Sequence, residues 1–443
     1  MFTVAVVSLG CAKNLVDTEL MLGALRKSGF ELTQEQRAAD VILINTCSFL
    51  QDSRKEASLE IKKAVKNKKR GAIVAVAGCF VSSHGKDLKK LFPRVDLFLS
   101  FSGIPEAGKL CLQALKKNKA PLILKDNKNY IYNNKAPRVL ATLPHYAYVK
   151  IADGCDNCCA YCLIPSIRGN FRSRKIEDIT AEVRKLVALG VKEINLISQD
   201  TTGYGEDIYR KPSLPGLLKK LAKIKGLKCI RLLYLYPSRI TDELLETISS
   251  HKIIAPYFDI PLQHTESRLL QLMGRFYGKE EIEKLILKIR KRVKNAVLRT
   301  TLITGFPGET EKEFKKMLEF IRKIKFDKLG VFEYSREKNT RAYTLPGNIE
   351  KAEKTRRKEL LMKAQQKISL ELNKARIGSK IEVLTDTVVN QTASGRRSVD
   401  APDVDGRVYF RAGEEVKPGD LVTVKVVKAL PYDLIGEIVG YKT

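Results

Sequence analysis

Runs of consecutive apolar residues recur along the first quarter of this 443-residue chain, and helix-length segments separate them. A run without polar alternation is typical of a strand that is buried on both faces of a parallel sheet. We therefore predict an N-terminal α/β domain, residues 1–125, built on a doubly wound parallel sheet. The runs lie at residues 4–7, 41–44, 73–76 and 95–99, and the clearest helical segment is at 16–27.

Residues 126–140, with many Lys and Asn residues, are predicted to be a linker. After the linker, apolar runs again alternate with helix-length segments, over a longer stretch of the chain. Six apolar runs separated by helix-length segments predict an incomplete (β/α)6 barrel within residues 141–375, with a charged connecting helix at its end. In such barrels the chemistry takes place at the C-terminal ends of the strands. The predicted strands are residues 146–152, 193–198, 230–234, 257–260, 298–304 and 328–334.

The pattern changes again in residues 376–443. Segments rich in Val and Thr alternate there with turn sequences, Asp-Gly at 405–406 and Lys-Pro-Gly-Asp at 417–420. This alternation predicts a small all-β domain, an OB-like barrel. The chain is therefore predicted to be α/β overall with three domains, in keeping with roughly 150 residues per domain.

Composition narrows the class of protein. An apolar fraction of 44% excludes a wholly disordered chain. No apolar run approaches the ~18 residues of a transmembrane helix, and the N-terminus lacks the basic segment of a signal peptide. Nine cysteines, four of them within residues 155–162, are a poor disulfide framework and favour a metal site in a reducing compartment. We expect a cytoplasmic protein without a membrane partner.

The net charge of +30 is unevenly distributed along the chain. Residues 377–443 hold nine Lys and Arg against ten Asp and Glu, a net charge of −1, so residues 1–376 carry +31. A basic surface attracts anionic partners, and contact with ribosome or RNA is one interpretation. Solvated helix ends account equally well for many lysines, and the sequence leaves both interpretations open.

A cysteine loop directly after the first predicted barrel strand carries the strongest chemical signal. Cys155, Cys159 and Cys162 follow a C-x3-C-x2-C spacing, with Tyr161 before the last cysteine. Three thiolates on one loop can bind three irons of a 4Fe–4S cubane and leave the fourth iron open, as a catalytic site requires. The alternative is a zinc knuckle that uses Cys158, but no second Cys or His pair follows nearby. We interpret Cys158 as a bystander.

Three isolated cysteines, Cys11, Cys47 and Cys79, each close one of the first three predicted strands. The carboxyl ends of parallel strands share one edge of the sheet, where open α/β folds bind ligands. Gly10 and Gly78, the residues before Cys11 and Cys79, permit the close approach of a bulky group. Cysteine is also a frequent buried residue in strands, but three at equivalent strand ends favour a shared site.

The cysteine loop and the barrel pattern resemble the radical S-adenosylmethionine superfamily, whose members carry the C-x3-C-x2-C loop on a partial barrel. The resemblance implies that Cys155, Cys159 and Cys162 bind a 4Fe–4S cluster. The open iron of this cluster would chelate S-adenosyl-L-methionine and cleave it reductively to a 5′-deoxyadenosyl radical.

The whole chain is similar to the methylthiotransferase family, which joins an N-terminal cluster domain, a radical-SAM barrel and a C-terminal TRAM domain. This resemblance implies an auxiliary 4Fe–4S cluster on Cys11, Cys47 and Cys79, so the cofactors would be two 4Fe–4S clusters and S-adenosyl-L-methionine. It further implies insertion of a methylthio group at the β-carbon of an aspartate in the small-subunit ribosomal protein at the decoding centre. The segments that match such members are residues 8–19, 151–157, 162–174, 197–202 and 331–335.

The implied target is an unactivated C–H bond, which a general base cannot open, and the chain shows no hydrolase triad. We therefore assign no catalytic side chain and leave the radical chemistry to the cofactors. Residues at strand ends are candidates for binding S-adenosyl-L-methionine, with barrel-rim hydrogen bonding as the alternative; they are Gln199, Gln263, Arg299 and Gly305. Three arginines either contact anionic substrate groups or form a solvated helix start; they are Arg168, Arg172 and Arg174.

The resemblance implies a small-subunit ribosomal protein as partner, free or in the ribosome, and an electron donor such as flavodoxin or ferredoxin. The first alternative is a tRNA adenosine methylthiotransferase, for which tRNA would be the partner. The slightly acidic residues 377–443 favour a protein substrate, whereas the basic residues 1–376 weakly favour tRNA. A second alternative is an RNA-binding scaffold with purely structural clusters, but a three-ligand loop is not typical of a structural site.

Overall fold

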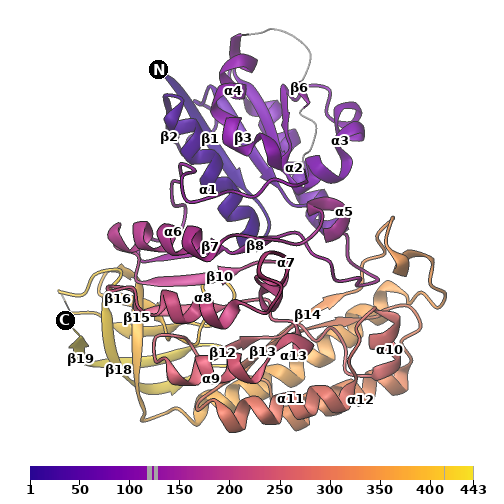
Figure 1. The fold of residues 1–443 in the computed structure, drawn as a ribbon, viewed down its shortest axis with the longest axis vertical. Helices are drawn as coiled ribbons and strands as arrows, with labels where there is room; N and C mark the ends of the chain where they lie inside the picture. The colour runs from indigo at the N-terminus through magenta and orange to yellow at the C-terminus, as the bar shows by residue number, and fades with distance from the viewer. Residues whose placement is uncertain (117–121, 124–127, 414, 443) are drawn as a thin grey trace.

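The computed structural model describes residues 1–116, 122–123, 128–413 and 415–442. They form an N-terminal sheet domain, a central half-open barrel and a small C-terminal barrel at the far side of the central one (Figure 1). The predicted α/β class and three-part architecture are confirmed. The predicted boundary between residues 125 and 126 lies outside the described residues, and the other domain limits remain predictions.

The N-terminal domain is a six-stranded parallel sheet with helices on both faces. Alternate strand residues face opposite helix layers, which is why the strands read as unbroken apolar runs. Val4 and Leu43 pack on the side of the first helix, whereas Ile42 and Val74 pack on the side of the second. The sheet order is β2 (Phe30–Thr33), β1 (Phe2–Ser8), β3 (Val41–Thr46), β4 (Ile73–Gly78), β5 (Leu97–Leu99) and β6 (Leu122–Ile123).

The sequence patterns missed the two edge strands, β2 and β6, because each is too short to give a periodic signal. The helices of this domain follow the strands in a regular βα alternation. They are α1 (Ala12–Lys27), α2 (Gln51–Asn67), α3 (Cys79–Leu91), the 3-10 helix η1 (Phe101–Glu106) and α4 (Ala107–Lys116).

The central barrel contains all six predicted strands. They form two three-stranded parallel sheets, which a parallel bridge between Ile230 and Ile254 joins into one curved wall. In the part of the chain that the structure describes, no strand pairing closes the wall between its first and last strands. The strands, in spatial order, are β7 (Tyr146–Lys150), β10 (Glu193–Ile197), β11 (Cys229–Leu232), β12 (Tyr257–Asp259), β13 (Val297–Thr304) and β14 (Lys328–Glu333).

Helices cover the outside of this wall and bury its apolar face in the largest core of the molecule. The long ones are α6 (Ile176–Ala188), α8 (Leu214–Leu221), α9 (Asp242–Ser250), α11 (Lys279–Arg292), α12 (Glu311–Ile324) and α13 (Lys351–Lys374). The short elements are β8 (Ala152–Asp153), α5 (Ile164–Arg168), β9 (Arg172–Ser173), η2 (Thr201–Gly203), α7 (Glu206–Tyr209), η3 (Pro237–Arg239), α10 (Ser267–Leu272) and η4 (Arg341–Thr344).

The C-terminal domain is a closed five-stranded barrel, as predicted. The loop of residues 397–405, which we call the plug loop, enters the N-terminal end of the central barrel. Tyr148 on β7 donates a hydrogen bond to Pro402 O (3.3 Å), and Tyr257 on β12 donates one to Asp405 (2.7 Å). The small barrel consists of β15 (Lys380–Val389), β16 (Thr392–Arg396), β17 (Val408–Arg411), β18 (Leu421–Ala429) and β19 (Leu434–Lys442).

The N-terminal domain sits over the opposite, C-terminal end of the central barrel (Figure 1). Lys13 on α1 lies over the ring of Tyr234, which follows β11, and Arg54 on α2 pairs with Glu337 (2.7 Å), which follows β14. The carboxyl edge of the N-terminal sheet therefore faces the strand ends at which barrel chemistry takes place.

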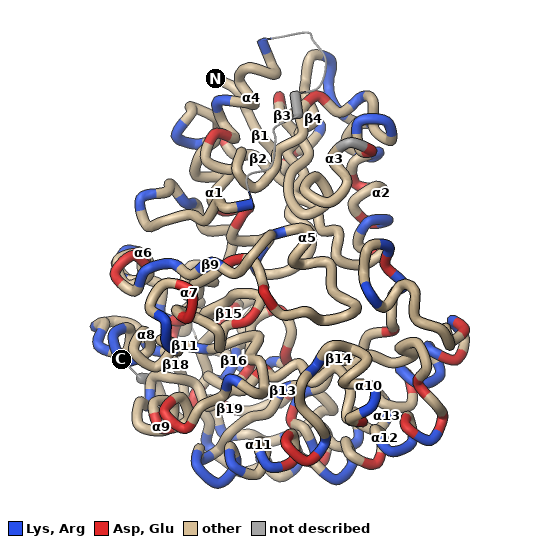
Figure 2. Tube along the Cα trace, turned by 45° about the vertical axis from the view of Figure 1, so that its right-hand side comes forward, with Lys and Arg blue, Asp and Glu red and all other residues tan. Residues whose placement is uncertain are grey.

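Charged residues are spread over the surface. Figure 2 shows basic and acidic residues interleaved on the outer helices α11, α12 and α13. Several form ion pairs there, such as Lys323 with Glu283 (3.0 Å) and Arg356 with Glu353 (2.7 Å). The described helices include none with the length and apolar character of a membrane span.

Candidate functional site

The three isolated cysteines lie at the carboxyl ends of three adjacent strands. Cys11 caps the start of α1 after β1, Cys47 follows β3, and Cys79 opens α3 after β4. The sheet thus brings the three together on one edge, as the spacing predicted. Gly10 has a φ of 95°, and a Cβ there would lie 2.8 Å from Cys47 Cβ and 3.2 Å from its Sγ, so a side chain would crowd this thiol.

The three thiols differ in their electrostatic surroundings. Cys11 is exposed on one side, and the packing around its thiol acts to raise its pKa. The charges of Lys13 and Arg168, together with backbone hydrogen bonds to the thiol, outweigh this effect and lower the pKa. Burial raises the pKa of Cys47, and it raises that of Cys79 to about 12 although Arg168 acts in the opposite sense. Metal binding requires thiolates, so a bound metal group would supply the positive charge that the buried pair lacks.

The cysteine loop, residues 154–162, lies at the carboxyl end of β7 and β8. Gly154 has a φ of 77°, and a Cβ there would lie 2.0 Å from Asn170 O, so the turn into the loop requires glycine. Two neighbouring segments hold the loop from both sides: Ala160 N donates to Met273 O (2.8 Å), and Ala342 N donates to Ala160 O (2.8 Å).

The three thiols of this loop form one group. The backbone N–H of Cys162 donates to Cys159 O (3.2 Å), and Ile164 N donates to Cys162 Sγ (3.4 Å). Burial raises the pKa of Cys155 to about 11 and that of Cys162 to about 12, and the negative charge of a Cys159 thiolate adds to both. The Cys158 thiol is exposed and donates instead to Asp156 O (3.7 Å).

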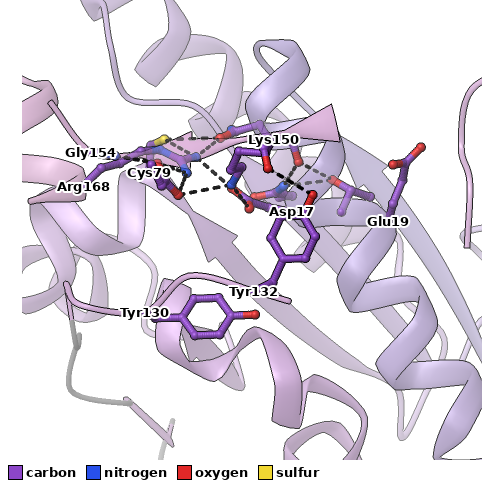
Figure 3. A network of polar contacts seen from close by, with 12 residues as sticks. Asp17, Glu19, Cys79, Tyr130, Tyr132, Lys150, Gly154 and Arg168 are labelled. Atoms are coloured by element: carbon purple, nitrogen blue, oxygen red, sulfur yellow. Dashed lines mark hydrogen bonds and ion pairs between the residues drawn. The ribbon is translucent and has the colours of Figure 1, made fainter. Parts of the chain in front are cut away.

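A buried network of charged side chains runs from the start of the cysteine loop, at Asp153 and Gly154, to Cys79 of the N-terminal domain (Figure 3). Arg168, on α5 after the cysteine loop, donates to Asp17 of the N-terminal domain (2.8 Å) and to Asp153 of the barrel (3.0 Å). Lys150 contacts the same two carboxylates at 2.5 and 3.2 Å. One Arg168 nitrogen also lies 3.7 Å from Cys79 Sγ, so the network reaches from the barrel loop to the N-terminal thiols.

Asn14 is the point at which this network meets the sheet edge. Its side-chain oxygen accepts hydrogen bonds from Arg168 (2.8 Å) and from the Cys79 thiol (3.3 Å). Its amide nitrogen donates to Leu9 O and Thr46 O, the backbone beside the other two cysteines. Asn14 therefore ties the three strand ends to the barrel.

The donor sets suit clusters better than single ions. Across the described ranges, no three His, Cys, Asp or Glu side chains converge on a point that one metal ion would occupy. This finding gives no support to a zinc knuckle, whose ligands share one ion. The thiolates of a 4Fe–4S cluster bind different irons and stand further apart, and an all-sulfur donor set is the one such clusters use.

Among the candidates for binding S-adenosyl-L-methionine, Gln199 and Gln263 lie at the C-terminal end of the barrel. Gln199 Nε2 donates to Asp153 (2.8 Å), next to the cysteine loop, and its Oε1 is buried without a hydrogen-bond partner. Gln263 has a φ of 72°, and its backbone bonds to Thr301 and Ile303 on β13. An unpaired buried acceptor such as Gln199 Oε1 is an open position for a ligand donor.

Arg299 and Gly305 have other neighbours. Arg299 pairs with Asp259 (2.7 Å) and lies 3.9 Å from Asp405 of the plug loop. Gly305 packs closely against Lys354 of α13, since a Cβ at this position would lie 2.2 Å from Lys354 Cγ. The space that the missing side chain of Gly305 leaves is filled by Lys354.

The prediction of a solvated helix start is wrong for two of the three arginines, and contact with anionic substrate groups stays a prediction. Arg168 and Arg174 are both buried, at 3% exposure. Arg174 pairs with Glu182 (2.5 Å) and Asp178 (2.7 Å), as Arg168 pairs with its two carboxylates. Arg172 is half-buried and donates to backbone carbonyls, including Arg168 O (3.0 Å). Local sequence patterns do not reveal that Arg168 is buried, because its partner Asp17 belongs to the N-terminal domain.

The sequence patterns did not indicate four residues that lie beside the cysteines. Lys13 and Tyr234 pair across the interface, with Lys13 Nζ 3.4 Å from the ring centroid. Arg275 donates to the Tyr161 hydroxyl within the cysteine loop (3.0 Å) and lies 4.7 Å from the ring centroid of Tyr236. Lys13 stands two positions after Cys11, which is a weak signal, whereas nothing near Arg275 in the sequence indicates the site.

Three family models match consecutive parts of the chain. The model described as uncharacterized protein family UPF0004 matches residues 3–100, which include Cys11, Cys47 and Cys79. The radical SAM superfamily model matches residues 149–321, and the TRAM domain model matches residues 377–439. The three matches follow the order of the sheet domain, the central barrel and the small barrel.

Curated relatives match over nearly the full length. The protein named ribosomal protein uS12 methylthiotransferase RimO from Pelotomaculum thermopropionicum is 44% identical and covers 98% of this chain and 99% of its own. The protein of the same name from Clostridium botulinum is 42% identical and covers 99% of this chain and 98% of its own. The solved structure of the radical SAM methyltransferase TsrM from Kitasatospora setae is similar with a TM-score of 0.54, over 88% of this chain and 77% of TsrM. Because the sequence identity is 13%, this similarity shows the fold alone.

Proposed function

Because this chain belongs to the family of ribosomal protein uS12 methylthiotransferases named RimO, we propose that it inserts a methylthio group at the β-carbon of an aspartate in protein uS12. The observation that carries the proposal is the arrangement of six cysteines. Two triads stand at facing strand ends, one on the N-terminal sheet and one on the barrel, with the Arg168 network between them.

The cofactors of this activity are 4Fe–4S clusters and S-adenosyl-L-methionine. We assign Cys155, Cys159 and Cys162 to the radical-SAM cluster. The auxiliary cluster is assigned to the second triad, Cys11, Cys47 and Cys79. When bound, these groups supply the radical that opens the C–H bond and the methylated sulfur that replaces the hydrogen.

The protein side chains in this proposal bind and orient. Gly154 and the backbone bonds of Ala160 fix the cysteine loop, and Gly10 leaves room beside Cys47. The network of Arg168, Asp17 and Asp153 fixes the N-terminal domain and the barrel relative to each other, so the distance between the triads stays constant. A fixed distance matters because a radical at one site must meet the sulfur delivered at the other.

For S-adenosyl-L-methionine we propose contacts from Gln199 and Gln263 at the barrel rim. The unpaired Oε1 of Gln199 supports this assignment for the first residue. Arg299 and Gly305 remain candidates, although Asp259 and Lys354 are their present neighbours. The electron donor is proposed to be a small soluble redox protein such as flavodoxin or ferredoxin.

The tRNA alternative is not favoured, since the full-length relatives are named for a ribosomal protein. The experiment that separates the two uses the anaerobically reconstituted protein, dithionite and S-adenosyl-L-methionine, with uS12 or bulk tRNA as substrate. We expect mass spectrometry to find one methylthio group on the uS12 aspartate, and none when that aspartate is replaced by alanine. A methylthio group on tRNA adenosine with uS12 unmodified would contradict the proposal.

A further inference from the structure

Buried cations in this protein usually have a carboxylate partner. Among the described residues, ten lysine and arginine residues are buried, and seven of them form ion pairs with Asp or Glu: Lys150, Arg168, Arg174, Arg231, Arg357, Arg396 and Arg397. The three without a carboxylate partner are Lys13, Arg275 and Lys354. A buried charge without an opposite charge is costly, so each exception needs a physical reason.

Two of the exceptions stand beside the cysteine triads, one at each. Lys13 follows Cys11 by two residues in the first turn of α1 and is 9% exposed. Arg275 is 6% exposed and belongs to the segment whose Met273 O accepts from Ala160 in the cysteine loop. Lys354, by contrast, packs against Gly305 and donates to Tyr334 O (3.2 Å), and its Nζ lies 5.1 Å from the ring centroid of Tyr334.

One short segment after β11 supports both cations. Lys13 Nζ lies over the ring of Tyr234, 3.4 Å from its centroid, and Arg275 Cζ lies over the ring of Tyr236, 4.7 Å from its centroid. The backbone of the segment is fixed at both tyrosines: Tyr234 N donates to Asp259 (3.0 Å), and Tyr236 N donates to Thr202 Oγ1 (2.9 Å). Two residues of one rigid turn therefore hold one cation toward each triad.

The ring face of tyrosine attracts a desolvated cation, but this attraction offsets only part of the cost of burying the charge. A thiolate triad with its cluster supplies the missing negative charge at both places, because the three thiolates outweigh the positive charge of the iron–sulfide core and leave the site anionic. The potential of such a cluster depends on the charges around it, and a nearby cation favours the reduced, more negative state.

We propose that Lys13 and Arg275 are the counter-charges of the auxiliary cluster and the radical-SAM cluster, respectively, and that each raises the reduction potential of its own cluster. The inference rests on the proposed assignment of the two triads. It adds that the two potentials are set separately, by one cation each, although the supporting tyrosines share one turn. Both are positioning residues, since their effect passes through the clusters.

The test measures each cluster alone by redox titration monitored by electron paramagnetic resonance. The auxiliary cluster is titrated in a chain whose Cys155, Cys159 and Cys162 are changed to Ala. The radical-SAM cluster is titrated in a chain whose Cys11, Cys47 and Cys79 are changed to Ala. We expect Lys13→Met to shift the midpoint of the auxiliary cluster to a lower potential and to leave the other unchanged, and Arg275→Met to do the reverse.

Charge-conserving variants separate charge from packing. Lys13→Arg and Arg275→Lys should keep the wild-type midpoints. Lys354→Met, which removes the buried lysine that Tyr334 holds, should shift neither midpoint. If a Met variant fails to bind its cluster, retention of iron by the charge-conserving variant supports the inference and its loss overturns it. Unshifted midpoints, or equal shifts of both clusters, also overturn it. A wild-type chain that binds no second cluster would instead contradict the proposed function.

Discussion

The two ends of the central barrel are both rich in buried polar groups, but they differ in how these groups are paired. At the N-terminal end, Arg231 and Arg396 share Glu193, and Arg396 also pairs with Asp386 (2.8 Å), which bonds to His145 (2.8 Å). The plug loop accepts further hydrogen bonds there from Tyr148 and Tyr257.

At the C-terminal end the pairing is incomplete. The two cysteine triads lie at this end, and the described residues include no group of His, Cys, Asp or Glu that could hold a single metal ion. Gln199 Oε1 has no hydrogen-bond partner there, as Arg231 Nε has none at the other end. Lys13 and Arg275 lie there without carboxylates. The difference in charge pairing indicates which end is structural and which is chemical. A buried cation beside a carboxylate is already compensated, whereas one without a carboxylate marks a place where a ligand can supply the opposite charge. Four predictions test this contrast, from the largest effect to the smallest.

The largest effect is expected for Cys159→Ala in the cysteine loop. Loss of one of three thiolates should release the radical-SAM cluster, so the formation of 5′-deoxyadenosine from S-adenosyl-L-methionine should fall to the background level. High-performance liquid chromatography of the reduced reaction measures the product. Cys229→Ala, which removes a buried cysteine of the structural end, is the matched control and should keep the cleavage. Equal loss in both variants would contradict the contrast.

Cys47→Ala should separate the two triads. It removes a proposed ligand of the auxiliary cluster but none of the cysteine loop, so cleavage of S-adenosyl-L-methionine should persist while methylthio transfer to uS12 is lost. The two products are measured in one reaction, by chromatography and by mass spectrometry of uS12. Methylthio transfer at the wild-type rate would show that Cys47 is a buried strand residue without a role.

A smaller effect is expected from breaking a buried ion pair at either end. Arg168→Met leaves Asp17 and Asp153 with Lys150 as their paired cation, and Arg231→Met removes one of the two cations that pair with Glu193. Each should lower the free energy of unfolding by about 3 kcal/mol. Urea unfolding of the cluster-free protein measures this loss.

The two variants should differ in function. Because Arg168 lies between the triads, Arg168→Met should reduce methylthio transfer more than S-adenosyl-L-methionine cleavage. Arg231→Met should leave the ratio of the two activities unchanged. The same ratio in both variants would mean that the Arg168 network has only a structural role.

The smallest effect is expected at the plug loop. Tyr148→Phe removes the hydroxyl that donates to Pro402 O (3.3 Å) and contacts Asp403 (3.2 Å). The free energy of unfolding should fall by about 1 kcal/mol, the usual value of a buried hydrogen bond. Cleavage of S-adenosyl-L-methionine should stay at the wild-type rate, and a clear loss of cleavage would show that the plugged end takes part in the chemistry.

Much of the fold was predictable from the sequence, because its strands are buried on both faces. The runs at residues 41–44 and 73–76 identify β3 and β4, and the six barrel runs identify all six barrel strands. The edge strands β2 and β6 were not predictable, since they are too short for a period to appear. The insertion of the plug loop into the barrel depends on contacts between segments about 250 residues apart, such as Tyr148 with Pro402.

The candidate site was predictable where the chemistry is carried by cysteine. The spacing of Cys155, Cys159 and Cys162 is local, and the convergence of Cys11, Cys47 and Cys79 follows from the parallel sheet. The counter-charges were not predictable from local patterns, because the role of a lysine or arginine depends on which carboxylates are absent from its surroundings. Arg168 shows this limit: its partners Asp17 and Asp153 are contributed by two domains.

The central claim is that the two cysteine triads bind one cluster each. The most direct measurement is the iron and acid-labile sulfide content of the anaerobically reconstituted protein, compared with the variant that lacks Cys11, Cys47 and Cys79. Since each 4Fe–4S cluster holds four irons, we predict about eight irons per wild-type chain and about four per variant chain. About four irons in both proteins would contradict the account.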